Sequence, residues 1–434
     1  MNVASSAIRI GVLGAGTVGG HVIYLLEKWA EEYERRLGTR LIVESVLVRR
    51  LDAQRAFPIE QDLLSTDPYA VIDGKDIVVE LIGGVEPAFD YVMAALRGGS
   101  AVVTGNKALI ASRGPELFEA ARQFNTRLYY EAAVAGAIPV IHALSSSLRG
   151  DRVRQIAGIV NGTTNFILDA MTTRGAEYHE ALKQAQDLGF AEADPSADVE
   201  GYDASAKCAI MSTLAFGRWI GVDSIPRQGI TSLSPSDIAF AAEQGCVIKL
   251  VARAQVREEA GDRLLARGVE PTFVPLTHSF ASLHGPANGV YVDAEASGTL
   301  GFLGLGAGGY PTASAVLGDI VAAARDRIDH QGALRMEEES DLVLTQEWSV
   351  ASPFIIRLTL RADAHNCETI TAICSSHAVS LSALDVTRGD TEGQEVITLR
   401  TDVVRRDRAH GLVDALSNAC DVLTPPAIFP LLDI

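Results

Sequence analysis

Short apolar runs alternate with longer amphipathic segments over the first 150 residues. Apolar runs predict strands at Ile8–Leu13, Leu41–Val48, Asp76–Ile82, Ser100–Thr104 and Arg127–Glu131. Between them, apolar positions at helical spacing predict helices at Val18–Leu37, Pro87–Arg97 and Lys107–Phe124. Strands and helices in this alternation are typical of a doubly wound parallel sheet, so residues 1–150 are predicted to form an α/β domain of the Rossmann type.

The hydrophobic pattern is less regular from residue 151 to 330. Strands are predicted at Val153–Val160, Val247–Gln255, Arg263–Val269 and Gly289–Val292. Helices are predicted from the Asn161 turn to about Thr173, at Glu177–Leu188, and through the apolar segment that follows Asp203. The pattern favours an α+β domain with a mixed sheet. The glycine-dense stretch 301–314 is predicted as a loop, and the helix around 311–327 is predicted to pack back on the first domain.

The chain ends in a third pattern after a predicted linker at 331–352. Strands are predicted at Phe354–Ala362, Val379–Val386, Glu395–Thr401 and Val422–Ile428, and helices at Cys367–Ser376 and Arg406–Ala419. This β-α-β-β-α-β order predicts a ferredoxin-like domain over residues 353–434.

Composition excludes some classes of function. The 434 residues are 47% hydrophobic and 21% charged, with a net charge of -18, which argues against nucleic-acid binding. No apolar run is long enough to span a membrane, and no signal-peptide pattern opens the chain. The cysteines are scattered without metal-ligand spacing and are expected to be reduced thiols of a cytoplasmic protein; they are Cys208, Cys246, Cys367, Cys374 and Cys420.

A glycine motif follows the first predicted strand at once. It reads Gly14-Ala15-Gly16-Thr17-Val18-Gly19 and opens a helix, the setting that dinucleotide binding requires. Its glycines allow a tight turn, close approach to a pyrophosphate, and close packing of the helix on the strand. Arg49 and Arg50 end the second strand, where an NAD-preferring domain usually carries an acid. They favour NADP. Two alternatives remain open: one of the arginines is only a surface residue, or the protein uses both NADP and NAD.

Two further segments lie at predicted strand ends, where ligands of such sheets bind. Thr104-Gly105-Asn106-Lys107 could bring Lys107 to cofactor or substrate, although a lysine early in a helix is often only solvated. Glu131–Pro139 is small, apolar and glycine-containing. Its backbone carbonyls could hold a monovalent cation; a tight crossing into the second domain is the simpler interpretation.

The richest chemistry lies in residues 189–207. Carboxylates accumulate ahead of one lysine, Lys207, at Glu192, Asp194, Asp198, Glu200 and Asp203. Asp203 and Lys207 are four residues apart, so on a helix they share one face. The acids suit the ammonium group of a small substrate, and the lysine could move a proton. The alternative is an acid-rich loop and a solvated helix face.

These motifs together resemble the homoserine dehydrogenase family. The match rests, in family order, on 14–19, 104–107, 131–139, Ile159–Phe166, 189–195, 198–207 and 306–314. The resemblance implies reversible NAD(P)-dependent conversion of L-aspartate 4-semialdehyde to L-homoserine, in threonine and methionine biosynthesis. It also implies that residues 151–330 form the substrate-binding, catalytic and dimerisation domain of a homodimer or homotetramer.

The resemblance also implies residue roles. Lys207 corresponds to the acid/base lysine, with Lys107 as a second lysine on the cofactor side and Asp203 in the catalytic set. Glu192, Asp203 and Asp198 would position the substrate. The cofactor would be lined by the glycine motif, Arg49, Arg50, Thr104, Lys107, Gly189 and Gly306. A monovalent cation, Na⁺ or K⁺, would bind mostly backbone oxygens of Glu131, Val134, Gly136 and Ile138.

The C-terminal pattern resembles an ACT domain, a module that often binds amino acids. The Pro-Gly usual at its first strand–helix turn is replaced here by Arg361-Ala-Asp-Ala-His-Asn-Cys367. Feedback by L-threonine and a role in subunit pairing both remain open.

Two other hypotheses stay beside this one. An aldehyde dehydrogenase that forms an acyl enzyme would need a cysteine nucleophile, and Cys208 is the cysteine nearest the acidic stretch. A non-catalytic sensor of nucleotide and amino acid would bind both ligands without turnover, but it would have no need for the proton donor Lys207.

Overall fold

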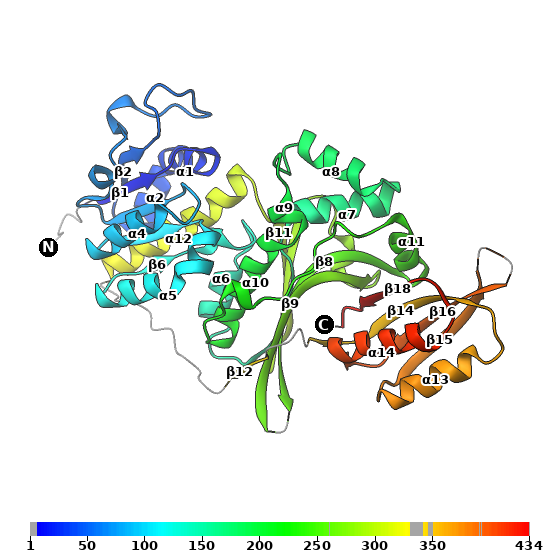
Figure 1. Ribbon diagram of the computed structural model, residues 1–434. Helices are drawn as coiled ribbons and strands as arrows, with labels where there is room; N and C mark the ends of the chain where they lie inside the picture. Colours follow the sequence, from blue (N-terminus) through cyan, green and yellow to red (C-terminus); the bar gives the residue numbers. More distant parts are fainter. Residues whose placement is uncertain are drawn as a thin grey trace.

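The computed structural model describes residues 7–259, 261–329, 342–345, 350–389, 391 and 393–433. Three main sheets follow one another along the molecule (Figure 1). A parallel sheet lies at the N-terminal end, a long mixed sheet occupies the middle, and an antiparallel sheet lies at the far end.

The first sheet is parallel throughout, with strand order β3-β2-β1-β4-β5-β6. Its strands are β1 (Ile8–Leu13), β2 (Leu41–Leu47), β3 (Leu64–Ser65), β4 (Ile77–Glu80), β5 (Ala101–Thr104) and β6 (Leu128–Tyr129). Its helices are α1 (Thr17–Lys28), α2 (Ala30–Leu37), α3 (Pro68–Ile72), α4 (Ala88–Arg97) and α5 (Lys107–Gln123). This order is that of the dinucleotide-binding fold, and the doubly wound prediction is confirmed.

The helix predicted over Val18–Leu37 is wrong in one respect, because it breaks at Trp29 into α1 and α2. α1 buries six residues, whereas α2 buries only Tyr33. α1 is therefore held on the sheet by packing, whereas α2 is held by few buried contacts and need not continue along the axis of α1.

Helix α12 (Gly309–Ile328) returns to this first sheet from late in the chain. Its Val316 and Ile320 share an apolar cluster with Val22 of α1, and Figure 1 shows the helix among the N-terminal elements. Arg127 and the Tyr129 hydroxyl of β6 both contact Asp326 of α12. The segment between β6 and α12 is thus inserted into the first unit.

The middle sheet has strand order β11-β10-β7-β8-β9-β12 and is antiparallel except between β9 and β12. Its strands are β7 (Val153–Ile159), β8 (Cys246–Glu259), β9 (Asp262–Pro275), β10 (Ala287–Ala294), β11 (Gly298–Leu305) and β12 (Leu342–Leu344). The predicted mixed sheet is confirmed. Most of the predicted linker at 331–352 lies outside the described residues, and β12 lies within it.

The glycine-dense stretch predicted as a loop contains strand β11 instead. Gly301 lies under the ring of Tyr291, where an added Cβ would come within 2.9 Å. At Gly304 an added Cβ would come within 3.3 Å of Ile138. Glycine here therefore makes room for neighbouring side chains on a strand.

Helices cover one face of the middle sheet and bring the acidic stretch to its edge. They are α6 (Val140–His142), α7 (Gly162–Arg174), α8 (Tyr178–Asp187), α9 (Ser196–Val199), α10 (Tyr202–Phe216) and α11 (Pro235–Glu243). α10 is almost entirely buried and contacts both the middle sheet and α5 of the first unit. This position carries Asp203 and Lys207 to the boundary between the two units (Figure 1).

The third sheet is antiparallel, in the order β15-β16-β14-β18. Its elements are β14 (Phe354–Arg361), α13 (Asn366–Ser376), β15 (Leu381–Arg388), β16 (Gln394–Thr401), α14 (Arg406–Ala419) and β18 (Val422–Pro430). A short pair, β13 (Ala351–Ser352) with β17 (Val404–Arg405), joins its start to α14. The ferredoxin-like order of elements is as predicted.

The residues after β18 pack on the second face of the middle sheet. Leu432 is buried there, and its amide donates to the Phe273 carbonyl at 2.8 Å. On the helix-covered face, the ring of Phe429 of β18 stacks on Phe273 with centroids 4.6 Å apart. Asp433 accepts a hydrogen bond of 2.7 Å from the buried Arg253 of β8. The third unit is thus tied directly to the middle one.

Helix α11 offers a test of local stability. Its N-cap Ser234 forms a capping box with Asp237, in which each side chain bonds the other residue's backbone amide. Replacing Ser234 with alanine is expected to lower the free energy of unfolding by about 1 kcal/mol. Urea unfolding followed by circular dichroism measures it. Ser234→Thr, which can still cap, should lose much less; equal losses would contradict the capping role.

Among the described residues, no helix combines the length and apolar character needed to cross a bilayer.

Candidate active site

Two lysines from different units meet at one buried carboxylate. Asp203 of α10 is 5% exposed and pairs through Oδ2 with Lys207 Nζ at 2.8 Å. Its Oδ1 pairs with Lys107, the first residue of α5. Lys207 also donates a hydrogen bond of 2.6 Å to the Val160 carbonyl at the end of β7. The solvated-face alternative is therefore wrong for Asp203 and Lys207, because both are buried.

Asn161 joins this cluster to the acidic loop. Its Nδ2 donates to Asp203 Oδ2 at 2.8 Å and to Asp198 Oδ1 at 2.6 Å. Its Oδ1 accepts the Thr164 amide at 2.8 Å and so caps α7. Sequence analysis placed Asn161 at the turn before this helix and missed its contacts with both carboxylates.

The pKa values diverge within the cluster. Burial lowers the pKa of Lys207, the charge of Lys107 adds to this, and Asp203 opposes the change without cancelling it. Burial also acts against the charge on Lys107, but Asp203, with Asp198 and Glu192, raises the pKa of Lys107 overall. Burial disfavours charge on Asp203 too, yet the two lysines hold its pKa below its usual range. Lys207 is therefore the ammonium that loses its proton more readily.

The predicted substrate acids surround this cluster. Asp198 lies in α9 and contacts Asn161, and Glu192 lies in the exposed loop before α9. Both carboxylates act to raise the pKa of Lys107, and Asp198 acts in the same way on Lys207, so Asp198 is near both ammonium groups. Gly189 has a positive φ of 76° at the start of this loop and sets the direction in which the acids leave α8.

The glycine motif forms an open turn at the end of β1. Gly14 has a φ of 103°, and a Cβ on Gly19 would lie 2.0 Å from the Gly14 carbonyl oxygen, so both positions need glycine. Gly16 is the N-cap of α1, makes no side-chain cap, and faces open space. Ala15, Thr17 and Val18 complete the turn. It is a cradle that a pyrophosphate fits.

Arg49 and Arg50 are exposed beyond β2, and the loop after them is fixed by a residue that sequence analysis missed. Arg55 donates hydrogen bonds to the carbonyls of Arg50 at 2.7 Å and Ala53 at 2.9 Å. No motif marked this arginine, since its role depends on how the loop folds back.

Two other predicted cofactor residues are in tight surroundings. Thr104 is fully buried and donates to Glu80 Oε2 at 2.6 Å, so its hydroxyl is already used. Gly306 lies against Asn288, whose side chain an added Cβ would meet at 2.1 Å. A Cβ on Gly136 would in turn meet Gly306 at 2.5 Å. The Gly306 loop and the loop that carries Gly136 thus touch through glycines.

The predicted cation loop begins with a short 3-10 helix at Glu131–Ala133. The Glu131 carboxylate accepts the amides of Ile141 at 2.9 Å and His142 at 2.7 Å, so it faces α6. The Glu131 amide donates to Asp319 of α12, and burial raises the pKa of Asp319 to about 7. Ligand atoms of Glu131, His142 and Asp319 lie within 4.8 Å of one another, a grouping that sequence analysis missed.

Cys208 is not placed for nucleophilic attack. It is fully buried next to Lys207 in the chain, and its thiol contacts the Arg253 carbonyl at 3.6 Å, under the middle sheet. Burial raises the pKa of Cys208 to about 11, which keeps the thiol protonated. The acyl-forming alternative therefore loses its nucleophile.

Comparison with known proteins agrees with this arrangement. Residues 14–131 match the family model "Homoserine dehydrogenase, NAD binding domain", and residues 139–321 match the model "Homoserine dehydrogenase". A homoserine dehydrogenase of Mycobacterium tuberculosis is 49% identical over 325 residues, which are 74% of this chain and 73% of that protein. One of Mycobacterium leprae is 39% identical over 420 residues, 96% of this chain and 94% of that protein.

Solved structures show the same likeness. The structure of a homoserine dehydrogenase from Thiobacillus denitrificans has a TM-score of 0.89 at 36% identity and covers 98% of both chains. A hyperthermophilic archaeal homoserine dehydrogenase in complex with NADPH has a TM-score of 0.61 at 25% identity, over 76% of this chain and all of the other. With its parallel nucleotide-binding sheet and the buried lysine–carboxylate cluster beside it, the chain belongs to the homoserine dehydrogenase family of nicotinamide-dependent oxidoreductases.

Proposed function

We propose that the chain catalyses the reversible NADP(H)-dependent interconversion of L-homoserine and L-aspartate 4-semialdehyde, with Lys207 as the group that moves the proton. The observation that carries this is the buried Lys207, whose amine is held between Asp203 and the Val160 carbonyl. When bound, the nicotinamide accepts a hydride from the alcohol carbon, or supplies one to the aldehyde.

Lys207 completes the proton balance of this transfer. In oxidation, its neutral amine takes the proton of the hydroxyl group as the hydride leaves the carbon that bears this group. In reduction, its ammonium gives that proton to the oxygen on which negative charge develops. The lowered pKa of Lys207 makes the neutral form available at lower pH than for an exposed lysine. Homoserine oxidation is therefore expected to accelerate as pH rises.

The other charges position the substrate. Glu192 and Asp198 would hold the substrate ammonium, because both are carboxylates close enough to the cluster to act on the charge of Lys107. Lys107 stays protonated, and its ion pair with Asp203 links the nucleotide-binding unit to the substrate-binding unit. Asp203 sets the position of both ammonium groups, and Asn161 fixes Asp203.

The nucleotide cradle fits a dinucleotide, and the arginines beyond β2 favour NADP. The open space at Gly16 and the uncapped start of α1 leave amides free for a pyrophosphate. Arg49 and Arg50 are exposed, so either guanidinium could meet a 2′-phosphate.

Replacing Arg49 and Arg50 together with alanine is expected to raise KM for NADP⁺ about 10- to 100-fold, because charge-assisted hydrogen bonds to the 2′-phosphate are lost. KM for NAD⁺, which has no such phosphate, should change little. Initial rates with both cofactors measure this. Arg97→Ala, also an exposed arginine of the first unit, is the matched control. A parallel rise for both cofactors would contradict 2′-phosphate recognition.

The cation, regulation and assembly are further parts of the proposal. A monovalent cation would bind the backbone carbonyls of Glu131, Val134, Gly136 and Ile138. At Glu131 the ligand would be the carbonyl, because the carboxylate already accepts hydrogen bonds from the α6 amides. The ferredoxin-like unit would act as an ACT domain that pairs subunits of a homodimer or homotetramer or binds L-threonine. The five free cysteines support a cytoplasmic setting, with the product entering threonine and methionine biosynthesis.

The direct test is nicotinamide absorbance with L-homoserine and NADP⁺ at alkaline pH. Turnover that yields the aldehyde is the expected result. A folded protein that binds NADP⁺ and NAD⁺ but turns over neither with L-homoserine would overturn the proposal and favour a sensor.

A further inference from the structure

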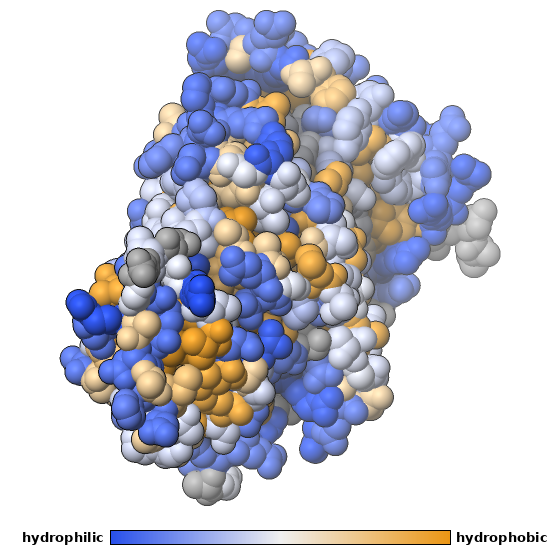
Figure 2. All heavy atoms as spheres, turned by 90° about the vertical axis from the view of Figure 1, so that its right-hand side faces the viewer, coloured by the Kyte–Doolittle hydropathy of each residue, from blue (hydrophilic) through white to orange (hydrophobic). Residues whose placement is uncertain are grey.

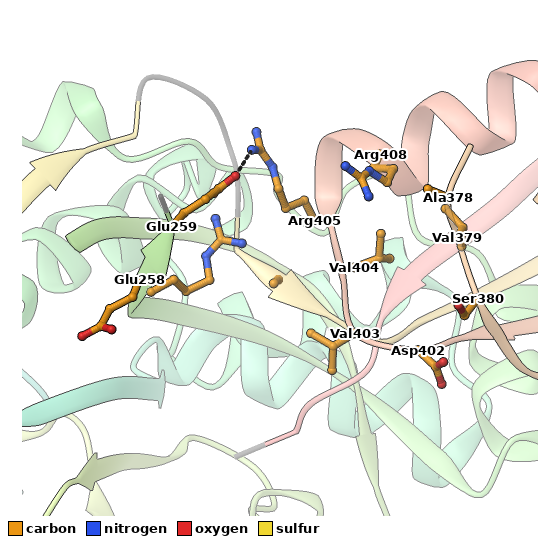
Figure 3. Close-up of a pocket in the computed structure, with 12 residues that line it drawn as sticks. Glu258, Glu259, Ala378, Val379, Ser380, Asp402, Val403, Val404, Arg405 and Arg408 are labelled. Carbon is orange, nitrogen blue, oxygen red and sulfur yellow. Dashed lines mark ion pairs between the residues drawn. The ribbon is translucent and has the colours of Figure 1, made fainter. Parts of the chain in front are cut away.

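A cavity of about 460 Å³ lies between the end of β8 and the ferredoxin-like unit. None of the active-site residues described above lines it. Its walls come from the β8 end, from β13 and β17, from the turn 378–380 after α13, and from the first turn of α14 (Figure 3). The cavity therefore lies where the middle sheet and the ferredoxin-like unit meet.

Arg257 of β8 lines this cavity and has an unused hydrogen-bonding edge. Its Nε and Nη2 are shielded from solvent and have no hydrogen-bond partner in the described structure. These two nitrogens form the side of the guanidinium that binds two oxygens of one carboxylate or phosphate at once. An arginine does not lose its proton in a protein, so this is a shielded charge with two unmade hydrogen bonds.

The acids around Arg257 do not fill this edge. Glu259 pairs with Arg405 at 3.8 Å, and Asp407 pairs with Arg405 at 2.9 Å. Figure 3 shows the Glu258 carboxylate pointing away from Arg405 and Arg408, and Asp402 beside Ser380 across the cavity. Burial, then the charge of Arg405, lowers the pKa of Arg257, with Glu259 and Asp407 acting against this. The free edge of Arg257 is thus bonded by none of the carboxylates that the structure describes.

Two further features favour an anion on the opposite wall. Arg408 is exposed on the first turn of α14 and lines the cavity. α14 has 14 residues, and no side chain caps its N-terminus at Arg405. The amides of its first turn add partial positive charge near Arg408, which Asp407 in the same turn partly offsets.

We propose that this cavity is a binding site for a small oxyanion, a carboxylate or a phosphate group, held by the Nε–Nη2 edge of Arg257 and by Arg408 at the start of α14. Arg257 lines the cavity, and a rotation of its guanidinium would turn the shielded edge toward the ligand. The ligand would bridge the middle sheet and the ferredoxin-like unit. The site lies at the end of the ferredoxin-like sheet opposite the Arg361–Asn366 turn, since Thr401 pairs near the start of β14.

The experiment uses the full chain in chloride buffer near neutral pH. Sodium phosphate and disodium succinate are added separately against sodium chloride of equal ionic strength, with calorimetry for binding and thermal unfolding for stabilisation. Saturable binding of at least one anion, with a rise in Tm, is expected. Phosphate alone would assign a phosphate ligand, and succinate alone a carboxylate ligand; binding of neither would overturn the site.

Arg257→Gln should bind the same anion about 10- to 100-fold more weakly, because the bidentate charged contact is lost. In chloride alone it should be at least as stable as the wild type, since a shielded unpaired charge is removed. Arg408→Gln should weaken binding less. Arg361→Gln, an exposed arginine at the other end of the unit, should bind like the wild type. Equal affinities in Arg257→Gln and Arg361→Gln would overturn the assignment. Homoserine turnover, unchanged in Arg257→Gln, shows that the variant is folded.

Discussion

Replacing Lys207 with alanine is expected to reduce kcat for homoserine oxidation about 10²- to 10⁴-fold, the contribution typical of a positioned proton-transfer group. Lys207 is the ammonium of the cluster whose pKa is lowered, and it lies against Asp203 and the Val160 carbonyl. Removing the amine leaves no group at that place to take the hydroxyl proton. Steady-state kinetics as a function of pH measure the effect, and the rise of rate with pH should flatten.

Lys107→Ala is the comparison that separates the roles of the two lysines. Lys107 carries a raised pKa and remains charged, so its loss should act mainly on KM for substrate and cofactor. Cofactor binding, followed by quenching of protein fluorescence, should persist in Lys207→Ala. If Lys107→Ala abolished turnover and Lys207→Ala kept the wild-type pH profile, the assignment of the proton to Lys207 would be wrong.

Asp203→Asn is expected to give the second large effect, on stability and activity together. The change removes the carboxylate from two ammonium groups and leaves Lys207 buried without its counter-ion. Breaking a buried pair in this way costs about 3–5 kcal/mol of unfolding free energy. Asp203 also opposes the lowered pKa of Lys207, so without it that pKa falls further. The rise of homoserine oxidation with pH should therefore move to lower pH while its maximum drops.

The stability loss in Asp203→Asn has a pH signature. The native-state pKa of Lys207 lies below its unfolded value, so the unfolded chain binds more protons and the fold gains stability as the pH rises through this interval. The interval is wider in Asp203→Asn, because the pKa of Lys207 falls further there, so the variant gains more stability than the wild type. The deficit against wild type should therefore shrink as pH rises. Asp187→Asn is the matched control: Asp187 pairs with Lys183 at the same i, i+4 spacing, but on an exposed face, and should lose under about 1 kcal/mol. Similar losses in the two variants would contradict the importance of burial.

Much of this architecture could be predicted from local pattern. The parallel sheet follows from apolar runs separated by helical segments. The turn at Gly14–Gly19 could be predicted because its backbone conformation and close contacts require glycine at Gly14 and Gly19. The Asp203–Lys207 pair could be predicted because helical spacing fixes which side chains meet. The ferredoxin-like order could be predicted because each of its elements is short and clearly patterned.

The remainder depended on contacts between distant segments. Nothing near Lys107 in the sequence indicates that it meets Asp203, since that contact requires α5 and α10 to pack across the two units. The direction of the pKa shift of Lys207 likewise depends on burial by those units. β11 was missed because glycine lowers strand propensity, while Tyr291 and Ile138 occupy the space that side chains would fill.

The packing of residues 429–433 on the middle sheet has a consequence for biosynthesis. The Leu432 amide donates a hydrogen bond to the Phe273 carbonyl, yet about 160 residues separate the two along the chain. At the usual pace of translation, roughly 10–30 s pass between the synthesis of the two. During that interval the strand that carries Phe273 has no cover from Phe429 and Leu432. The nascent middle sheet therefore exposes apolar side chains on both faces of this strand until the ferredoxin-like unit is complete, and chaperone contact should concentrate there.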